Sequence, residues 1–161
     1  MAFGEIFGKS GVAYPKVERV LSSTSHYALR ALGRLAQEPH GGLVLGRNLA
    51  REAHVPSQYL SKIMLMLRHA GMVDAARGTR GGYRLTRPPA QIRLRDVVEV
   101  FEGPLDRPQC LLGVNPECSD ATPCPAHPSW KRLRDAYMQF LEETTVGNFI
   151  AGAGNATEGE Q

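Results

Sequence analysis

Residues 110–130, CLLGVNPECSDATPCPAHPSW, hold every cysteine of the chain. These are Cys110, Cys118 and Cys124, and His127 follows the last of them by three residues. Three thiols are an awkward number for disulfides and one ligand short of a tetrahedral metal site. Thiolates are soft ligands that suit zinc or iron–sulfur clusters. The stretch therefore predicts a metal-binding loop whose fourth ligand has to be found elsewhere.

The cysteine spacing helps to choose between these metals. Cys₃His is an established set of ligands for structural zinc, but zinc sites usually include close pairs such as C-x2-C. Here seven and five residues separate the successive cysteines. Wide gaps suit a larger object whose ligands must spread, which favours an iron–sulfur cluster. The gaps do not separate the cluster types, and we expect [2Fe–2S] ahead of [4Fe–4S]. Zinc is the alternative.

The charge of the chain is divided unevenly between its halves. Residues 16–96 contain fourteen Lys and Arg against five Asp and Glu, whereas residues 97–161 contain four against ten. A basic first half predicts a module that binds a polyanion. Neither a membrane-spanning apolar run nor a signal peptide is recognisable, so we expect a cytoplasmic protein, in which thiols stay reduced.

Three helices are predicted in the basic half. Residues 22–36 begin with hydroxyl residues that can cap a helix and continue with leucines at helical spacing. A short helix fits 46–53, His54-Val55-Pro56 is a break, and Ser57 can cap a third helix over 58–70. Two helices around a short turn form a helix-turn-helix unit, whose second helix can enter the major groove of DNA.

A basic hairpin is predicted next. Residues 72–76 and 83–86 are short enough for strands, and the glycines between them permit a tight loop. A glycine-rich loop can also cradle a nucleotide phosphate, but such a loop must open a helix, and this one leads into YRLT and Pro88-Pro89. The hairpin is therefore the wing of a winged helix. We predict DNA contacts from Ser57, Gln58, Tyr59 and Lys62 of the third helix and from Arg77, Thr79, Arg80, Gly81, Gly82 and Tyr83 of the wing.

The acidic half is predicted to contain two helices around the cysteines. Residues 94–102 have an apolar face, and the proline-rich stretch 104–128 lacks periodicity. A longer helix follows within 129–150, and we expect Thr144 to Gly147 to end it. This last helix carries a stripe of large residues that either packs on its own domain or, as we prefer, forms a dimer. The stripe consists of Trp130, Leu133, Tyr137, Phe140 and Leu141.

The expected fold class is mainly α with a small β-hairpin: a winged helix-turn-helix plus a long C-terminal dimerisation helix. The expected organisation is an N-terminal extension (1–20), a DNA-binding domain (21–90), a linker helix (91–103), a cluster loop (104–128), the dimerisation helix (129–150) and a disordered tail (151–161).

As a whole the chain resembles the Rrf2 family of bacterial winged-helix regulators, in particular the IscR/NsrR-type iron–sulfur regulators. The matching stretches are HYALRAL, VPSQYLSKIMLMLRHAGMVDAARGTRGGYRLTRPP, RLRDVVEVFEG, CPAHPSW and FLEETTVGNFI, together about residues 21–150. The resemblance implies a homodimer with crossed long helices, DNA contacts from the third helix and wing, and a cluster on the three cysteines. Two departures are that residues 1–20 precede the matching region and that the first cysteine gap is longer than usual in the family.

The resemblance also implies candidates for the fourth ligand. His127 matches the Cys₃His arrangement of the IscR type. His26 is the alternative, because its position holds a carboxylate that reaches the partner's cluster in NsrR-type members. Glu117 and Asp120 are more remote candidates.

We therefore predict a regulator, such as a repressor, that binds a roughly palindromic DNA operator as a homodimer and senses redox state, nitric oxide or iron–sulfur supply through its cluster. The alternative is the same regulator with a zinc site. A cysteine near a histidine can also be an enzyme nucleophile. No orienting acid is evident, so we expect no enzyme.

Overall fold

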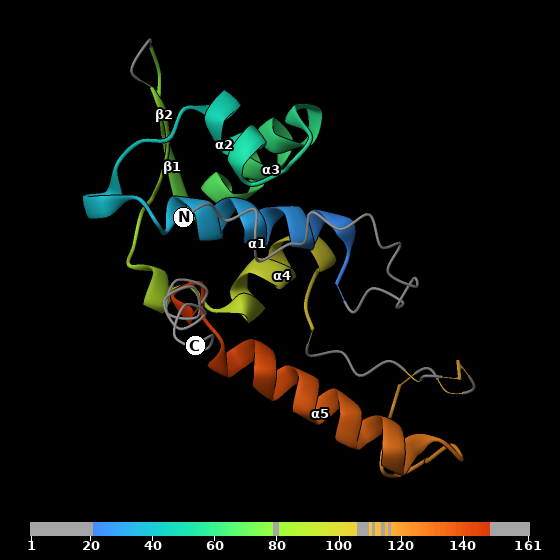
Figure 1. The fold of residues 1–161 in the computed structure, drawn as a ribbon. Helices are drawn as coiled ribbons and strands as arrows, with labels where there is room; N and C mark the ends of the chain where they lie inside the picture. The colour runs from blue at the N-terminus through green and yellow to red at the C-terminus, as the bar shows by residue number, and fades with distance from the viewer. Residues whose placement is uncertain are drawn as a thin grey trace, which may run out of the picture.

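The computed structural model describes residues 21–78, 81–105, 110, 112, 113, 115 and 117–148 (Figure 1). It confirms a mainly α fold with one antiparallel hairpin. The helices are α1 (Ser23–Leu35), α2 (Gly46–Glu52), α3 (Ser57–His69), α4 (Leu94–Glu102) and α5 (His127–Glu143), the strands are β1 (Val73–Ala76) and β2 (Gly82–Leu85), and the 3-10 turns are η1 (Pro39–Gly41) and η2 (Pro89–Gln91).

One hydrophobic core joins α1, α2, α3 and α4. Its largest fully buried side chains include Leu32, Leu49, Ile63 and Leu67, which supply the inner faces that helical spacing predicted. The predicted cap of α1 is also present, because the Ser22 hydroxyl accepts a hydrogen bond from the Ser25 amide at 3.1 Å. The helices of the helix-turn-helix are therefore stabilised by packing against this core and not by helix propensity alone.

Some helix boundaries differ from the sequence prediction. Ser57 is the first residue of α3, and Pro56 occupies the N-cap position without a side-chain hydrogen bond, so the predicted capping role of Ser57 is wrong. An N-cap residue must precede the first helical residue, and this hydroxyl comes one position too late. α5 begins at His127, two residues earlier than predicted, and ends at Glu143, where the extended conformation of Thr144 stops it.

The wing is pinned to the body of the domain by its second strand. β1 and β2 pair with Val73 opposite Leu85, and Tyr83 also exchanges two main-chain hydrogen bonds of 2.9 Å with Val44. This contact brings the Val44 backbone against Gly82, where an added Cβ would lie 2.4 Å from the Val44 oxygen. Gly82 therefore has a packing role apart from any DNA contact.

Gly82→Ala is expected to destabilise the protein by about 1–3 kcal/mol, because the methyl group must displace the Val44 carbonyl from its pairing with Tyr83. Urea unfolding followed by circular dichroism measures the effect. Gly42→Ala is the control, since its added Cβ comes no closer than 3.4 Å to its neighbours. Equal stability of the two variants would contradict this account.

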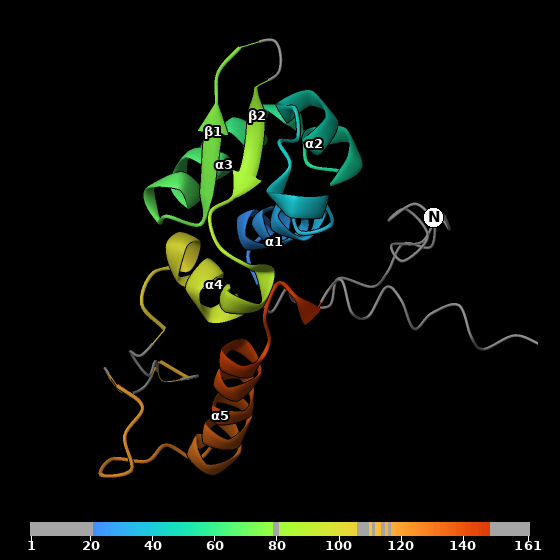
Figure 2. The same cartoon turned by 90° about the vertical axis from the view of Figure 1, so that its left-hand side faces the viewer.

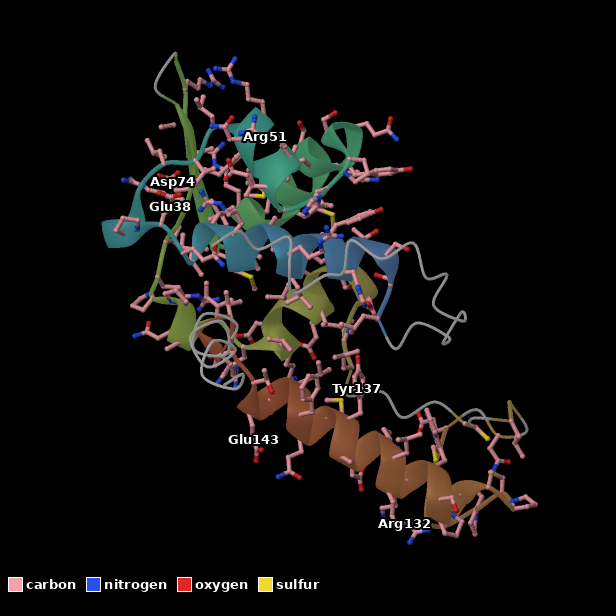
Figure 3. All side chains as sticks on the ribbon, in the orientation of Figure 1. Glu38, Arg51, Asp74, Arg132, Tyr137 and Glu143 are labelled. Atoms are coloured by element: carbon pink, nitrogen blue, oxygen red, sulfur yellow. The ribbon has the colours of Figure 1, made fainter. Side chains whose placement is uncertain are left out.

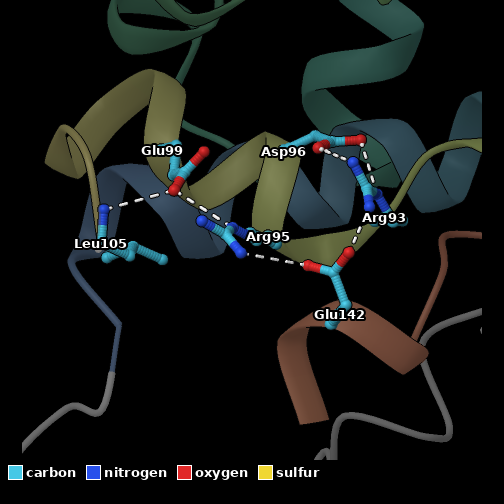
Figure 4. A network of polar contacts seen from close by, with 6 residues as sticks. All are labelled: Arg93, Arg95, Asp96, Glu99, Leu105 and Glu142. Carbon is cyan, nitrogen blue, oxygen red and sulfur yellow. Dashed lines mark hydrogen bonds and ion pairs between the residues drawn. The ribbon is translucent and has the colours of Figure 1, made fainter. Parts of the chain in front are cut away.

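α5 is attached to the winged domain at its C-terminal end and extends away from it (Figures 1 and 2). The Leu94 amide donates to the Thr144 oxygen at 2.9 Å, and the Val146 amide donates to the Ile92 oxygen at 2.8 Å. Beside them, Glu142 pairs with Arg93 and, at 3.4 Å, with Arg95 (Figure 4). These contacts form what we call the α4–α5 junction, from which the two helices diverge.

The cysteine loop, residues 104–126, connects the other ends of the same two helices. It leaves the C-terminal end of α4 and returns to the start of α5, which lies at the opposite end of the molecule from the wing (Figures 1 and 2). Among the residues that the structure describes, no helix is long and apolar enough to cross a membrane.

Candidate metal site and nucleic-acid interface

Cys118 and His127 come together at the start of α5. The Cys118 sulfur lies 3.2 Å from Nδ1 of His127, and the His127 amide donates to the Cys124 oxygen at 2.9 Å. His127 and Cys124 are both buried, being 6% and 8% exposed. Three of the four predicted ligands therefore lie close together. The contact between His127 and Cys124 is made by main-chain atoms.

The other side of the His127 ring is held by an acid–base pair. Nε2 of His127 lies 2.8 Å from Oδ1 of Asp120, and the second carboxylate oxygen lies 2.6 Å from Nζ of Lys131. Lys131 first, and His127 second, lower the pKa of Asp120 to about 2 by hydrogen bonding to it. The carboxylate is thus an ionised acceptor at neutral pH. Figure 3 shows sulfur atoms in the loop beside this end of α5, near the labelled Arg132.

The remaining metal candidates are more exposed than His127. Cys110 is partly exposed, Glu117 is exposed, and none of the three cysteines is in a disulfide. Within the described part of the chain, no three His, Cys, Asp or Glu side chains are placed to hold a metal ion together. His26 is exposed in the first turn of α1, which lies apart from the start of α5 in both views (Figures 1 and 2).

The predicted DNA-binding side chains of α3 share one exposed surface. Ser57, Gln58, Tyr59 and Lys62 are all exposed, whereas Leu60 between them is buried in the core. They lie in the first two turns of the helix, the part that reads bases in helix-turn-helix proteins. These four side chains therefore form an exposed surface at the start of α3, and the ring of Tyr59 is the member that also contacts α1.

The wing residues divide into exposed and structural positions. Arg77 is exposed, whereas Gly81 is buried in a tight turn and Tyr83 is partly buried against the core. Thr79 and Arg80 lie outside the described residues. Among the predicted wing residues that the structure describes, Arg77 is therefore the exposed cation that can reach a phosphate.

Tyr59 makes one contact that the sequence analysis missed. Its ring stacks on the ring of Tyr27 from α1, with centroids 6.2 Å apart and planes inclined by 24°. Tyr27 follows His26 directly. The start of α1 is therefore in contact with the recognition helix, and the aromatic at position 27, just ahead of the apolar face of α1, was the available signal.

Glu102 is a second residue that the sequence analysis passed over. Its carboxylate accepts hydrogen bonds from the Ser22 amide at 2.9 Å and from the Ser25 hydroxyl at 2.6 Å. It also contributes, after burial as the main cause, to raising the pKa of Tyr137 on α5 to about 12. The C-terminal end of α4 is thereby tied to the start of α1, a contact across eighty residues that no local pattern indicates.

The predicted dimer stripe on α5 is only partly exposed. Leu133 and Phe140 are 63% and 50% exposed, and their spacing of seven residues places them on one side of the helix. Leu141 is fully buried in the core of its own chain, and Tyr137 packs partly against that core. For Leu141 the structure thus shows packing within its own chain, which was the alternative to the dimer, and the dimer face itself stays a prediction.

Comparisons with known proteins agree with this architecture. A family model named Rrf2 and described as an iron-dependent transcriptional regulator matches residues 21–152. A protein of Aquifex aeolicus assigned to the HTH-type transcriptional regulators is 32% identical over 133 residues, 81% of this chain and 91% of the relative. The HTH-type transcriptional regulator CymR of Bacillus subtilis is 29% identical over 141 residues, 88% and 94% of the two chains.

Solved structures show the same fold. The structure of CymR, the global cysteine regulator of B. subtilis, superposes with a TM-score of 0.68 at 28% identity, covering 83% of this chain and 96% of that one. IscR of T. potens gives a TM-score of 0.70 at 24% identity, covering 91% and 97%. This second likeness concerns the fold.

Proposed function

The chain belongs to the Rrf2 family of transcriptional regulators, and we propose that an iron–sulfur cluster on its cysteine loop sets its affinity for DNA. It is a DNA-binding regulator and not an enzyme. The proposed ligands are Cys110, Cys118, Cys124 and His127. The 3.2 Å approach of the Cys118 sulfur to Nδ1 of His127 carries the proposal, because it joins a thiol and an imidazole nitrogen where the loop meets α5.

The donor pair suits a metal site. A thiol and an imidazole nitrogen that lie 3.2 Å apart could both bind iron of a cluster, or zinc, once the thiol has lost its proton. When bound, a cluster supplies a redox-active iron centre whose state responds to its surroundings. The three cysteines and His127 would hold this centre, and metal bonds of this kind stabilise the folded loop that supplies them.

Binding to DNA as a homodimer is the second part of the proposal. The exposed face of α3 faces away from the core, and the exposed Leu133 and Phe140 of α5 leave an apolar strip for a second copy. A two-fold dimer presents two recognition helices to the halves of a palindrome. We therefore place the operator contacts on α3 and the wing, and the dimer contacts on the outer face of α5.

Two other functions of the loop compete with the cluster. A zinc ion fits the same Cys₃His set. A response of the cysteine thiols without a metal is the other candidate, because the chain is similar to CymR, whose structure is described as that of the global cysteine regulator of B. subtilis.

One measurement separates the three. Protein expressed with ample iron and purified without oxygen is assayed for iron, acid-labile sulfide and zinc. Iron and sulfide together support the cluster, about one zinc per chain supports the zinc site, and protein lacking all of these supports the thiol response.

Arg77→Ala is expected to weaken binding to all DNA sequences and to reduce the salt dependence of log K by about one unit, because one phosphate contact is lost. Arg80→Ala is expected to act in the same way. Fluorescence anisotropy with operator and unrelated duplexes across a salt series measures both effects. Arg132→Ala, which removes an exposed cation from α5, serves as the control. An unchanged slope in the wing variants would exclude the wing from the phosphate interface.

A further inference from the structure

We propose that Asp120, held in place by Lys131, is a positioning residue that presents Nδ1 of His127 to the metal, an inference that rests on the proposed function. The structure contains an unbroken chain of polar contacts: Lys131 Nζ to Asp120 at 2.6 Å, Asp120 to His127 Nε2 at 2.8 Å, and His127 Nδ1 to Cys118 at 3.2 Å. The Lys131 ammonium donates to one carboxylate oxygen of Asp120, and the other carboxylate oxygen accepts from Nε2 of His127.

The chemistry of the chain decides which ring nitrogen is available. An ionised carboxylate only accepts hydrogen bonds, so the contact with Asp120 requires a proton on Nε2 of His127. In a neutral imidazole the other nitrogen then has a free lone pair, and here that nitrogen faces Cys118. Histidine ligands commonly donate their second N–H to a carboxylate, which fixes the ring and strengthens the metal bond.

The two residues that hold His127 come from different elements. Lys131 lies one turn after His127 on α5, so both side chains lie on the same face of the helix. Asp120 comes from the loop, two residues after Cys118. The pair therefore sets the distance between the loop and the helix as well as the orientation of the ring.

Burial makes the arrangement directional. His127 is 6% exposed, whereas the Asp120 side chain is 72% exposed. The ring is thus enclosed while its acceptor reaches it from the solvent side. Without Asp120 the buried imidazole could rotate, and either Nδ1 or Nε2 of His127 could then face the Cys118 sulfur.

The first test uses metal-free protein and does not depend on a cluster. In the proton NMR spectrum, the Nε2–H of His127 is expected as a downfield, slowly exchanging signal. Asp120→Ala should abolish it, and Asp120→Asn, which keeps an acceptor oxygen, should retain it. Asp135→Ala is the control, because this exposed carboxylate of α5 pairs with Arg134 instead. A signal that survives Asp120→Ala overturns the proposed contact.

The second test follows the release of iron from loaded protein to a chelator. Asp120→Ala is expected to accelerate release by about tenfold or more, with Asp120→Asn and Lys131→Gln intermediate and Asp135→Ala unchanged. If iron leaves the Asp120→Ala variant at the same rate as the unaltered protein, the positioning role of Asp120 is overturned but the proposed function is not. Wild-type protein that contains no iron and sulfide overturns the proposed function and, with it, the ligand role of His127.

Discussion

Cys118→Ala protein purified without oxygen is expected to be colourless and to lack iron and acid-labile sulfide, whereas the unaltered protein is expected to contain both. The physical reason is the position of Cys118, whose sulfur is the one in contact with the buried imidazole of His127. Without it the site has lost the thiolate beside His127, and the loop has too few soft ligands to assemble a cluster. Visible absorption with iron and sulfide assays measures the loss.

Thr122→Ala is the matched control for this experiment. It lies in the same loop and contributes its main-chain oxygen, which accepts a hydrogen bond from Asn115 at 2.6 Å. Its substitution is expected to leave colour and iron content unchanged. A full complement of iron and sulfide in Cys118→Ala would show that the cluster, if present, is held by other residues.

The same assay tests which histidine, His127 or His26, is the fourth ligand. His127→Ala is expected to change the visible spectrum and lower the iron content, because this ring lies against Cys118. His26→Ala is expected to leave both unchanged, since His26 is exposed in the first turn of α1. The reverse result would identify His26, contributed by one subunit to the loop of the other, as the fourth ligand.

The elements were predictable because each depends on local residue patterns. The spacing of leucines and the Ser22 cap indicated α1, and the glycines of residues 78–82 indicated the hairpin, all of which the structure contains. The bounds of α4 agree with the prediction to the residue, because Gly103, with its φ of 82°, ends a short helix that has a single apolar face.

The contacts between elements were not predictable in the same way. Burial of Leu141 depends on how α5 meets α4, which the stripe of large residues on α5 does not specify. Asp120 was considered only as a ligand, and its contact with His127 appears once the loop is folded back on α5. Lys131 could have been found, because it lies four residues after His127 and helical neighbours at that spacing share a face.

The arrangement of α4 and α5 suggests how the loop can influence DNA binding. The two helices meet at the α4–α5 junction and diverge from it, and the cysteine loop joins their far ends (Figures 1 and 4). α4 is in turn bound to α1 through Glu102, and α1 contacts the recognition helix through the stack of Tyr27 on Tyr59. A loop ordered by metal would fix the divergence of the helices, and so the placement of α3 relative to the dimer axis.

Holo and apo protein are therefore expected to differ in operator affinity by tenfold or more, about 1.4 kcal/mol of coupling. Half-site spacing is a geometric requirement, so a small rotation of each winged domain about the junction is enough to change the fit to both half-sites. Anisotropy titrations of one operator with cluster-loaded and chelator-treated protein measure the difference. Equal affinity of the two forms would refute the sensor function, whichever metal the cysteines hold.

Glu142→Gln tests the route of this coupling. The substitution keeps the shape of the side chain but removes its ion pairs with Arg93 and Arg95, which are partly exposed and therefore contribute little to overall stability. A loosened junction is expected to reduce the holo-to-apo affinity ratio by about two- to fivefold while iron content stays unchanged. Glu143→Gln is the control, because its carboxylate accepts a hydrogen bond from Gln139 of the same helix. If both variants retain the full ratio, the junction is not the hinge, and the coupling must run through the dimer partner instead.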